Sequence, residues 1–311
     1  MRFEKPPLTI KQQVDLLCRR GLVGDTGRMQ QCLKVVSYYR LSGYWYPFRR
    51  DDDTFKPNTS FAEVWRRYTF DRRLRLLVMD AIERIEVAVR SKLAHYHALA
   101  HGAFAYAAEA SSLPKLTSGD HASLLERIED ETERSKENFV KHFKAKYGDC
   151  HTHLPVWMMA EVMTFGTLLT FFRGSPHRVQ QDVASEFCMP AKVFGSWLLT
   201  LNMVRNICAH HGRLWNRELG LKPLIPRPDK YPEWHEPVEV RNNRVFCVLI
   251  ICQYCLHKLD SASDWAQELL RFLDAYSGIP LGAMGLPDNW QDCPIWRTAK
   301  SGNGDRHEVS R

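Results

Sequence analysis

The sequence lacks a long hydrophobic run. Its longest apolar stretch, VFCVLIIC at residues 245–252, is far shorter than the roughly 20 residues that a membrane-spanning helix needs. The first residues, MRFEKPPLTIKQQ, contain no apolar segment of the kind found in secretory signals. We therefore expect no membrane contact and a location in the cytoplasm.

Several motifs of catalysis and cofactor binding are also missing. The chain contains no internal repeat, no Gly-rich phosphate loop, and no GxSxG or HExxH sequence. No recognition-helix pattern with a two-helix turn is evident, so we do not expect sequence-specific DNA binding. The sequence indicates no cofactor.

The nine cysteines are an odd number scattered along a long chain, which argues against a disulfide framework. Two short clusters have spacings that a metal site could use. The first, Cys252 and Cys255, lies in an apolar helical segment where cysteine acts as a small hydrophobic residue. The second, CHTH at residues 150–153, lies in an expected loop. We therefore expect reduced thiols and no metal.

What is present is typical of a globular protein. The chain has 311 residues, of which 44% are hydrophobic and 25% charged, enough to form a substantial core. Lys and Arg number 43 against 36 Asp and Glu, which gives a formal charge of +7. This mild excess is compatible with an anionic partner.

Hydrophobic periodicity predicts an all-α protein. Thr9 is the expected N-cap of a short helix in residues 9–22, with Gly21 after its last turn. Ser60 with Glu63 forms a capping box for a long helix that reaches about residue 100. Residues 38–61, rich in aromatic and turn residues, predict a small irregular or hairpin insertion. Further helices are expected at residues 121–148, 154–172, 176–187, 201–212, 240–258 and 262–276.

The domain boundaries follow from these elements. Residues 1–60 hold the N-terminal helices and the aromatic loop, and we expect them to form one large domain with a helical core at residues 61–276. Residues 277–311 form a C-terminal extension. The tail after Trp296 lacks apolar anchors, so we expect it to be disordered. The apolar segment 154–172 is expected at the centre of the core.

Polar residues gather in LNMVRNICAHHGRLWNR, residues 201–217. If a helix continues to Gly212 at about 100° per residue, Asn206 and His210 fall within about 80° of Asn202, and Arg205 lies on the flank of this polar arc. His211 falls among the apolar residues instead. The spacing therefore favours His210 as the reactive histidine and predicts that His211 packs in the core.

Arginine, asparagine and histidine together suit the cleavage of RNA. The reaction moves protons from the 2′-hydroxyl and to the leaving oxygen, while negative charge gathers on the phosphate. Histidine can transfer protons near neutral pH, and the arginine fork can hold a phosphate without a metal. The same residues could equally cap helix carbonyls or bind surface carboxylates, and spacing alone does not separate these roles.

The stretch VRNICAHHGRLWNR resembles the signature of the bacterial Abi-like proteins (abortive infection, AbiD/AbiF type), a branch of the HEPN superfamily. Similar segments occur in order along the chain: KPPLTIKQQVDLL, YYRLSGYWYPF, FDRRLRLLVMDAIERIEVAVRSKLA, PVWMMAEVMTFGTL and GSWLLTLNMVRNICAHH. The resemblance implies a HEPN-type helical bundle with additional N- and C-terminal helices. It also implies an antiphage or toxin-like role.

The resemblance also implies metal-independent RNA cleavage by an arginine and a histidine in an Rx4-6H motif, often completed across a dimer interface. The resemblance places these roles on Arg205 and His210, with Asn206 as the polar residue after the arginine. His211 also fits the motif and remains an alternative to His210. RNA is then the substrate, a regulatory small RNA is a further partner, and the active form is a homodimer.

Other residues are candidates for supporting this site. Glu161 stands alone in an apolar run, so we expect it to be buried and to pair with Arg205 or another arginine. Arg90, one helical turn after Glu86, is expected to line the same cleft. Candidate RNA-binding residues combine arginines with aromatic rings: Arg213, Arg217, Arg72, Arg73, Tyr44 and Trp45.

The hypothesis is therefore a metal-independent endoribonuclease of bacterial antiphage defence, in which His210 acts as general acid and base and Arg205 stabilises the phosphate. The competing hypothesis is a non-catalytic RNA-binding protein that holds a small RNA as a scaffold or sensor.

Overall fold

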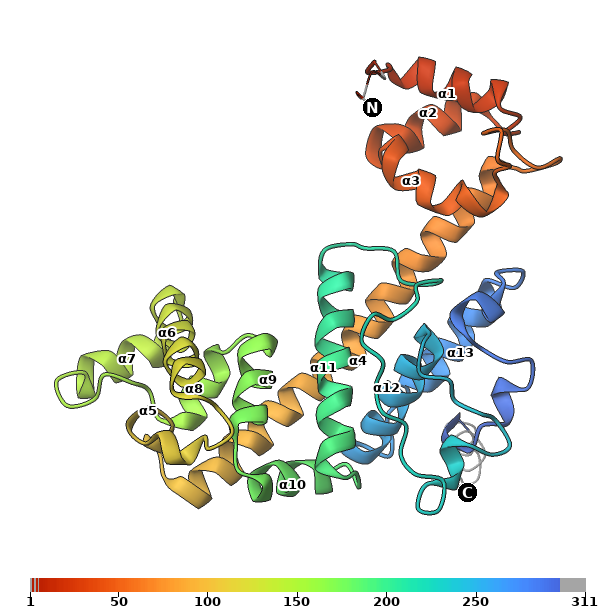
Figure 1. Cartoon of the computed structure of the whole chain (residues 1–311). Coiled ribbons are helices and arrows are strands. Elements are labelled where there is room, and N and C mark those ends of the chain that lie inside the picture. The colour runs from red at the N-terminus through yellow and green to blue at the C-terminus, as the bar shows by residue number, and fades with distance from the viewer. Residues whose placement is uncertain (1, 3, 5, 297–311) are drawn as a thin grey trace, which may run out of the picture. The chain divides into compact units, whose positions relative to one another are not determined.

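The computed structural model describes residues 2, 4 and 6–296 (Figure 1). Within these residues the protein is all-α, as predicted, and the β structure consists of isolated bridges between single residues. The chain divides into two compact units. We call residues 1–76 with 273–279 the N-terminal unit, and residues 77–272 with 280–311 the C-terminal unit. The tail that was expected to be disordered begins after Trp296 and lies outside the described residues.

The N-terminal unit begins with three short helices, α1 (Ile10–Arg19), α2 (Thr26–Val35) and α3 (Tyr38–Trp45). Thr9 caps α1 as predicted, because its side chain accepts from the Gln12 backbone while the Gln12 side chain accepts from the Thr9 backbone. The helix ends at Arg19, and Gly21 follows its last turn, as expected, with a positive φ of 93°.

The aromatic segment is more helical than predicted. Ser37 caps α3 by accepting from the Arg40 backbone, and a short 3-10 helix, η1 (Tyr46–Phe48), continues it. The remainder is the expected irregular insertion, closed by a single antiparallel bridge between Arg49 and Phe55. The N-cap serine explains the helix, because it satisfies one of the first free backbone donors.

Helix α4 (Phe61–His101) begins where the capping box predicted. Glu63 accepts from the Ser60 backbone N–H at 3.1 Å, and the Ser60 hydroxyl accepts from the Glu63 N–H at 3.2 Å. The first part of α4 completes the N-terminal unit, whose core holds a buried polar network. In it, the Tyr44 hydroxyl donates to Asp71 at 2.6 Å and Arg75 forms an ion pair with the same carboxylate.

The C-terminal unit contains the rest of α4 and the remaining elements. The first half comprises α5 (Ala105–Ala108), η2 (Ala110–Ser112), α6 (Ser118–Arg134), α7 (Asn138–Tyr147), α8 (Val156–Val162), α9 (Phe165–Gly174) and α10 (His177–Ser185). The second half comprises α11 (Ala191–Ala209), η3 (Pro232–Trp234), α12 (Val245–Leu259), α13 (Trp265–Ala275), η4 (Leu281–Met284) and η5 (Trp290–Asp292).

Two predicted helices are each split in the structure. The charged segment 121–148 forms α6 and α7, and the apolar segment 154–172 forms α8 and α9. Thr164 causes the second break, because its hydroxyl accepts from the Thr167 N–H and so caps a new helix. Helix α9 is buried as expected, whereas α8 buries only one side, which includes Val156 and Met159, and leaves Trp157 53% exposed.

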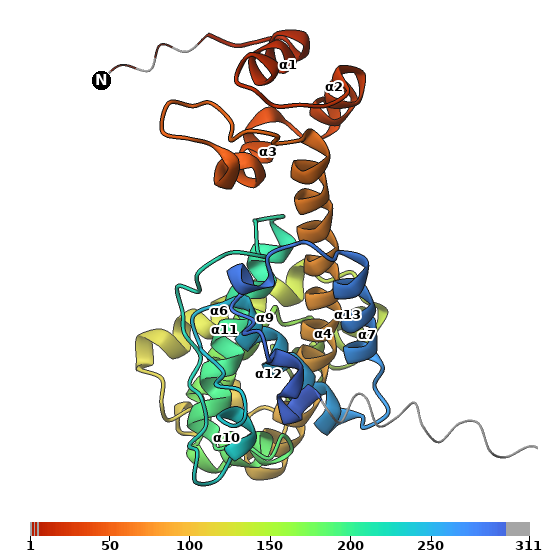
Figure 2. The same ribbon diagram turned by 90° about the vertical axis from the view of Figure 1, so that its right-hand side faces the viewer.

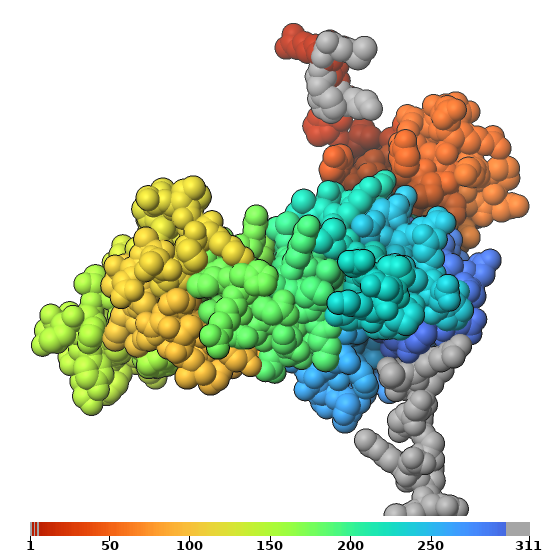
Figure 3. All heavy atoms as spheres, turned by 60° about the horizontal axis from the view of Figure 1, so that its bottom comes forward, coloured from red at the N-terminus to blue at the C-terminus, as the bar shows by residue number. Residues whose placement is uncertain are grey.

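Helix α11 lies at the centre of the C-terminal unit, beside α9, α10 and α12 (Figures 1 and 2). Its buried side includes Phe194, Trp197, Leu201 and Val204. The indole N–H of Trp197 donates to the Leu224 carbonyl at 2.8 Å, which anchors the connector between α11 and α12. Figure 3 shows the surface of α9–α11 (green) between the α5–α6 region (yellow) and this connector (cyan).

Candidate functional site

The motif lies at the C-terminal end of α11, and the helix ends at Ala209 rather than at Gly212. His210 is the C-cap, and its backbone N–H donates to the Asn206 carbonyl at 3.0 Å. The His211 N–H donates to Cys208 O at 3.0 Å, and the Gly212 N–H donates to Ile207 O at 2.7 Å. This pair of bonds is the Schellman motif that commonly closes helices.

His211 occupies the position of this motif that glycine usually takes, with a left-handed φ of 57°. A side chain with a Cβ costs roughly 1–2 kcal/mol in that conformation. Gly212 comes next because a Cβ there would lie 3.1 Å from the Ile207 Cγ2 and 3.2 Å from the Ile207 carbonyl oxygen. The chain therefore turns sharply after His210.

This turn overturns the expectation that His211 packs in the core. The helical angle used for that prediction applies only as far as Ala209, and after the turn the His211 side chain is exposed. His210 is exposed as well. Both imidazoles of the motif are therefore accessible to a ligand.

His210 lines an open groove of about 500 Å³. Asn202 and Asn206 line the same groove, so the polar arc predicted from helical spacing is present. Arg217 reaches the groove from the loop after α11, and its Nε donates to the Arg213 carbonyl at 2.8 Å. The other lining residues are Leu199, Met203, Ile207, Gly212 and Leu221. The groove thus joins an imidazole, two amides and a guanidinium to an apolar wall.

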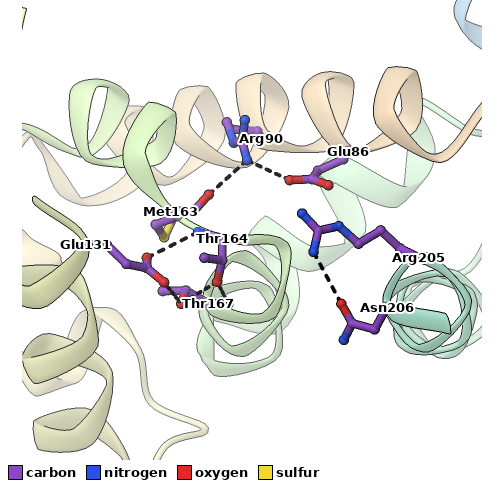
Figure 4. Close-up of polar contacts among 8 residues, drawn as sticks. All are labelled: Glu86, Arg90, Glu131, Met163, Thr164, Thr167, Arg205 and Asn206. Carbon is purple, nitrogen blue, oxygen red and sulfur yellow. Dashed lines mark hydrogen bonds and ion pairs between the residues drawn. The ribbon is translucent and has the colours of Figure 1, made fainter. Parts of the chain in front are cut away.

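The half-buried Arg205 points to the neighbouring side of α11, toward α4 (Figure 4). Its Nη1 donates to the Asn206 side-chain oxygen at 3.3 Å. Its guanidinium is turned toward Glu86 of α4, which is only 13% exposed and pairs with Arg90 at 2.7 Å. Asn206 therefore connects the groove with a charged cluster between α4 and α11.

Glu86 is the carboxylate of this cluster. Its burial raises its pKa above the ordinary value, and the positive charges of Arg90 and Arg205 offset that effect only in part. Arg90 also donates to the Met163 carbonyl at 2.9 Å, which ties α4 to the break between α8 and α9. Arg90 thus contacts Glu86 and the break between α8 and α9, and it is not among the residues that line the groove beside His210.

Glu161 was expected to be buried beside an arginine, and this expectation is wrong. It lies near the end of α8, and its side chain is exposed. Glu86, rather than Glu161, is the buried carboxylate that pairs with an arginine. A second carboxylate, Glu131 of α6, holds the start of α9 by accepting from the Thr164 N–H at 3.2 Å and the Thr167 hydroxyl at 2.8 Å (Figure 4). No local sequence signal marks this contact.

The candidate RNA-binding residues of the N-terminal unit fall into two groups. Arg72 and Arg73 are exposed, and the Arg73 guanidinium lies 5.7 Å from the centre of the Tyr276 ring. Tyr44 and Trp45 are only 2% and 1% exposed, so they are core residues whose rings cannot stack on bases. They are buried because α3 continues through them and turns one face inward.

Metal and membrane contacts were also expected to be absent. Among the described residues, no three His, Cys, Asp or Glu side chains are grouped so that they could hold a metal ion. Cys252 and Cys255 are completely buried in α12, and burial raises the pKa of both thiols. None of the helices in the described part of the chain has the length and hydropathy that crossing a bilayer requires.

The fold and the site define an all-α protein in which an Arg-x4-His sequence closes a central helix. Residues 31–216 match the family model of the Abi-like proteins, which is more than half of the chain and includes the motif. The protein belongs to this family. No curated protein and no solved structure matches the chain.

Proposed function

We propose that this protein is a metal-independent endoribonuclease of bacterial antiphage defence, with the HEPN-type mechanism of an AbiD/AbiF-like member. Membership of the Abi-like family supports the role in abortive infection. The groove at the end of α11 supports the chemistry, because the motif histidine lies there with two amides and a guanidinium. This donor set fits a phosphate better than a hard metal cation, which prefers carboxylate and carbonyl oxygens.

In the proposed reaction, one imidazole accepts the proton of a ribose 2′-hydroxyl as the 2′-oxygen attacks the neighbouring phosphorus. The bond from phosphorus to the 5′-oxygen breaks, and an imidazolium gives that oxygen its proton. The products are a 2′,3′-cyclic phosphate and a 5′-hydroxyl. His210 is the proposed proton carrier, with Asn206 and Arg217 holding the phosphate in the groove.

The angular position of Arg205 supports a homodimer. Arg205 and His210 are five residues apart, which is about 140° around a helix. In agreement with this angle, Arg205 turns toward Glu86 while His210 lines the groove. One copy therefore does not present both side chains to one side, whereas the two motifs of a homodimer would together supply two histidines and two arginines. A monomer in light scattering that still cleaves RNA at the same concentration contradicts the shared site.

The placement of Arg205 also favours a second candidate function. Its hydrogen bond to Asn206 and its proximity to Glu86 hold the guanidinium beside the groove. In a non-catalytic protein, that arrangement would shape a binding surface for a small RNA that serves as partner or regulator. The histidine would then contribute to affinity alone.

Incubating end-labelled RNA with the protein in excess EDTA separates the two functions. We expect the wild type to yield fragments that end in 2′,3′-cyclic phosphate, and His210→Ala to bind RNA without cleaving it. His142→Ala, which removes an exposed histidine of α7, is the matched control and should cleave normally. Bound but intact RNA with the wild type, combined with weaker binding by His210→Ala, would favour the binding protein.

A further inference from the structure

The formal charge of the protein is divided unevenly between its two units. The N-terminal unit contains 16 Lys and Arg against 9 Asp and Glu, which is a net charge of +7. The C-terminal unit contains 27 of each and is neutral. The N-terminal unit thus carries the whole excess of the chain, although the Rx4H motif lies in the other unit. An anionic partner is therefore attracted mainly to the N-terminal unit.

Two large aromatic rings project from this basic unit. Tyr39 is 89% exposed and Tyr46 is 68% exposed. They are seven residues apart along α3 and η1, which is two helical turns, or roughly 10 Å, on the same side of the helix. The residues between them on that side are Ser42 and Gly43, which are small. The two rings therefore have only small residues between them on this side of the helix.

Arginines accompany both rings. Arg40 follows Tyr39 and is exposed, as is Arg50 beyond η1. The Arg49 guanidinium lies 5.7 Å from the centre of the Tyr46 ring and is held there by an ion pair with Asp53. Rings and guanidinium groups thus alternate along one short segment.

The acidic residues 51–53 beside this segment have partners within the unit. Asp53 also accepts from Arg20 at 3.2 Å. Asp52 accepts from the backbone and the hydroxyl of Thr54, at 3.0 and 2.6 Å. Two of the three carboxylates are therefore engaged in holding the loop, and the excess of positive charge in the unit remains.

We infer that the N-terminal unit holds single-stranded RNA, with unpaired bases stacked on Tyr39 and Tyr46 and phosphates bound by the neighbouring arginines. Exposed rings interleaved with positive charge are the usual means of binding single strands. An acidic peptide would use the charge but not the two rings. The inference rests on the proposed function only in taking RNA as the partner, and it assigns affinity to a surface that is distinct from the motif.

The first test measures binding of a fluorescent, unstructured RNA oligonucleotide to full-length His210→Ala protein, in which the RNA stays intact. Adding Tyr39→Ala or Tyr46→Ala should weaken binding about tenfold each, since stacking is lost. Tyr39→Phe and Tyr46→Phe keep the rings and should bind normally. Tyr147→Ala is the matched control, because Tyr147 of the C-terminal unit is 42% exposed and lies 5.2 Å from the Lys146 ammonium.

The second test measures how the affinity for RNA depends on salt concentration. Removing two phosphate contacts with Arg40→Gln and Arg50→Gln should reduce the slope of log K against log salt by about 1.4. Arg178→Gln with Lys192→Gln removes the same charge from exposed positions of the C-terminal unit and should leave the slope unchanged. Equal slopes for both pairs, or binding that is insensitive to the tyrosines, would overturn the inference. Equally tight binding of DNA of the same sequence would overturn the assignment to RNA.

The two proposals fail separately. Tyrosine variants that bind RNA normally, in a protein whose wild type cleaves it, would reject the N-terminal surface and leave the nuclease intact. If RNA binding depends on the tyrosines but the wild-type protein never cleaves RNA, the nuclease is rejected and the N-terminal surface stands.

Discussion

Glycine at position 211 should make the protein more stable than alanine at the same position. His211 has a φ of 57° at the position where helices usually end in glycine. Removing the Cβ relieves roughly 1–2 kcal/mol of strain in the folded state. Glycine has more conformational freedom in the unfolded chain, which offsets about 0.5–1 kcal/mol of this gain in stability. The exposed imidazole contributes little buried apolar surface. Relative to His211→Ala, which loses the same imidazole contacts, we therefore expect a net gain of about 0.5–1 kcal/mol.

Thermal and urea unfolding measure this gain. For a domain the size of the C-terminal unit, the melting temperature of His211→Gly should exceed that of His211→Ala by about 1–3 °C. Both variants lose the imidazole, and only His211→Ala keeps the Cβ. His210→Gly is the matched control, because His210 has a φ of −86° and glycine brings no relief there. A His211→Gly protein no more stable than His211→Ala would refute the reasoning.

The same variant tests why histidine is kept at this position. If His211→Gly is more stable but cleaves or binds RNA less well, the strained residue is retained for function. If it is more stable and fully functional, His210 alone is the motif histidine, as helical spacing favours.

Three further outcomes follow from buried contacts. Burial, together with the neighbouring His101, lowers the pKa of His97 to about 4. The free energy of unfolding should therefore be highest above pH 6.5 and fall by about 3 kcal/mol as the pH drops toward 4. In His97→Gln, the midpoint of urea unfolding should depend less on pH. Tyr44→Phe removes the hydrogen bond to Asp71 and should cost about 1.5–3 kcal/mol in thermal unfolding, whereas Tyr39→Phe should cost nothing. Gly212→Ala crowds the Ile207 carbonyl, so it should lower the melting temperature and reduce RNA cleavage by shifting His210.

Local signals predicted the parts of the fold that local interactions determine. The capping boxes at Thr9 and Ser60 start α1 and α4 because the hydrogen bonds involved connect residues three apart. The polar arc through Asn206 and His210 was predictable for the same reason, since helical spacing alone places both on one side.

The helix end at the motif was harder to predict. Gly212 was taken as the residue that ends the helix, but the left-handed residue is His211 and Gly212 follows it. Histidine is only moderately favoured in that conformation, so sequence rules that search for glycine at this position fail. The error of a single position reversed the expected direction of the His211 side chain.

The partner of Arg205 depends on tertiary packing. Sequence predicted Glu161 as the partner because it stands alone among apolar residues. The packing of α4 near α11 instead places Glu86 near Arg205, and the Glu161 side chain is exposed. Likewise, Tyr44 and Trp45 are buried while Tyr39 and Tyr46 are exposed, although all four belong to one aromatic segment. Which rings face solvent is decided by contacts with distant residues.

The proposed division of RNA binding and catalysis between the two units has a kinetic consequence. If the basic N-terminal unit provides affinity and the neutral C-terminal unit provides the histidine, the two sets of variants should affect different constants. Removing Tyr39 or Tyr46 should raise KM and leave kcat nearly unchanged, since the lost contacts are the same in ground and transition states. Removing His210 should lower kcat with KM preserved, because proton transfer matters only in the transition state. A tyrosine variant that lowers kcat would place its ring at the reacting phosphate instead, and the two units could not then act as separate binding and catalytic elements.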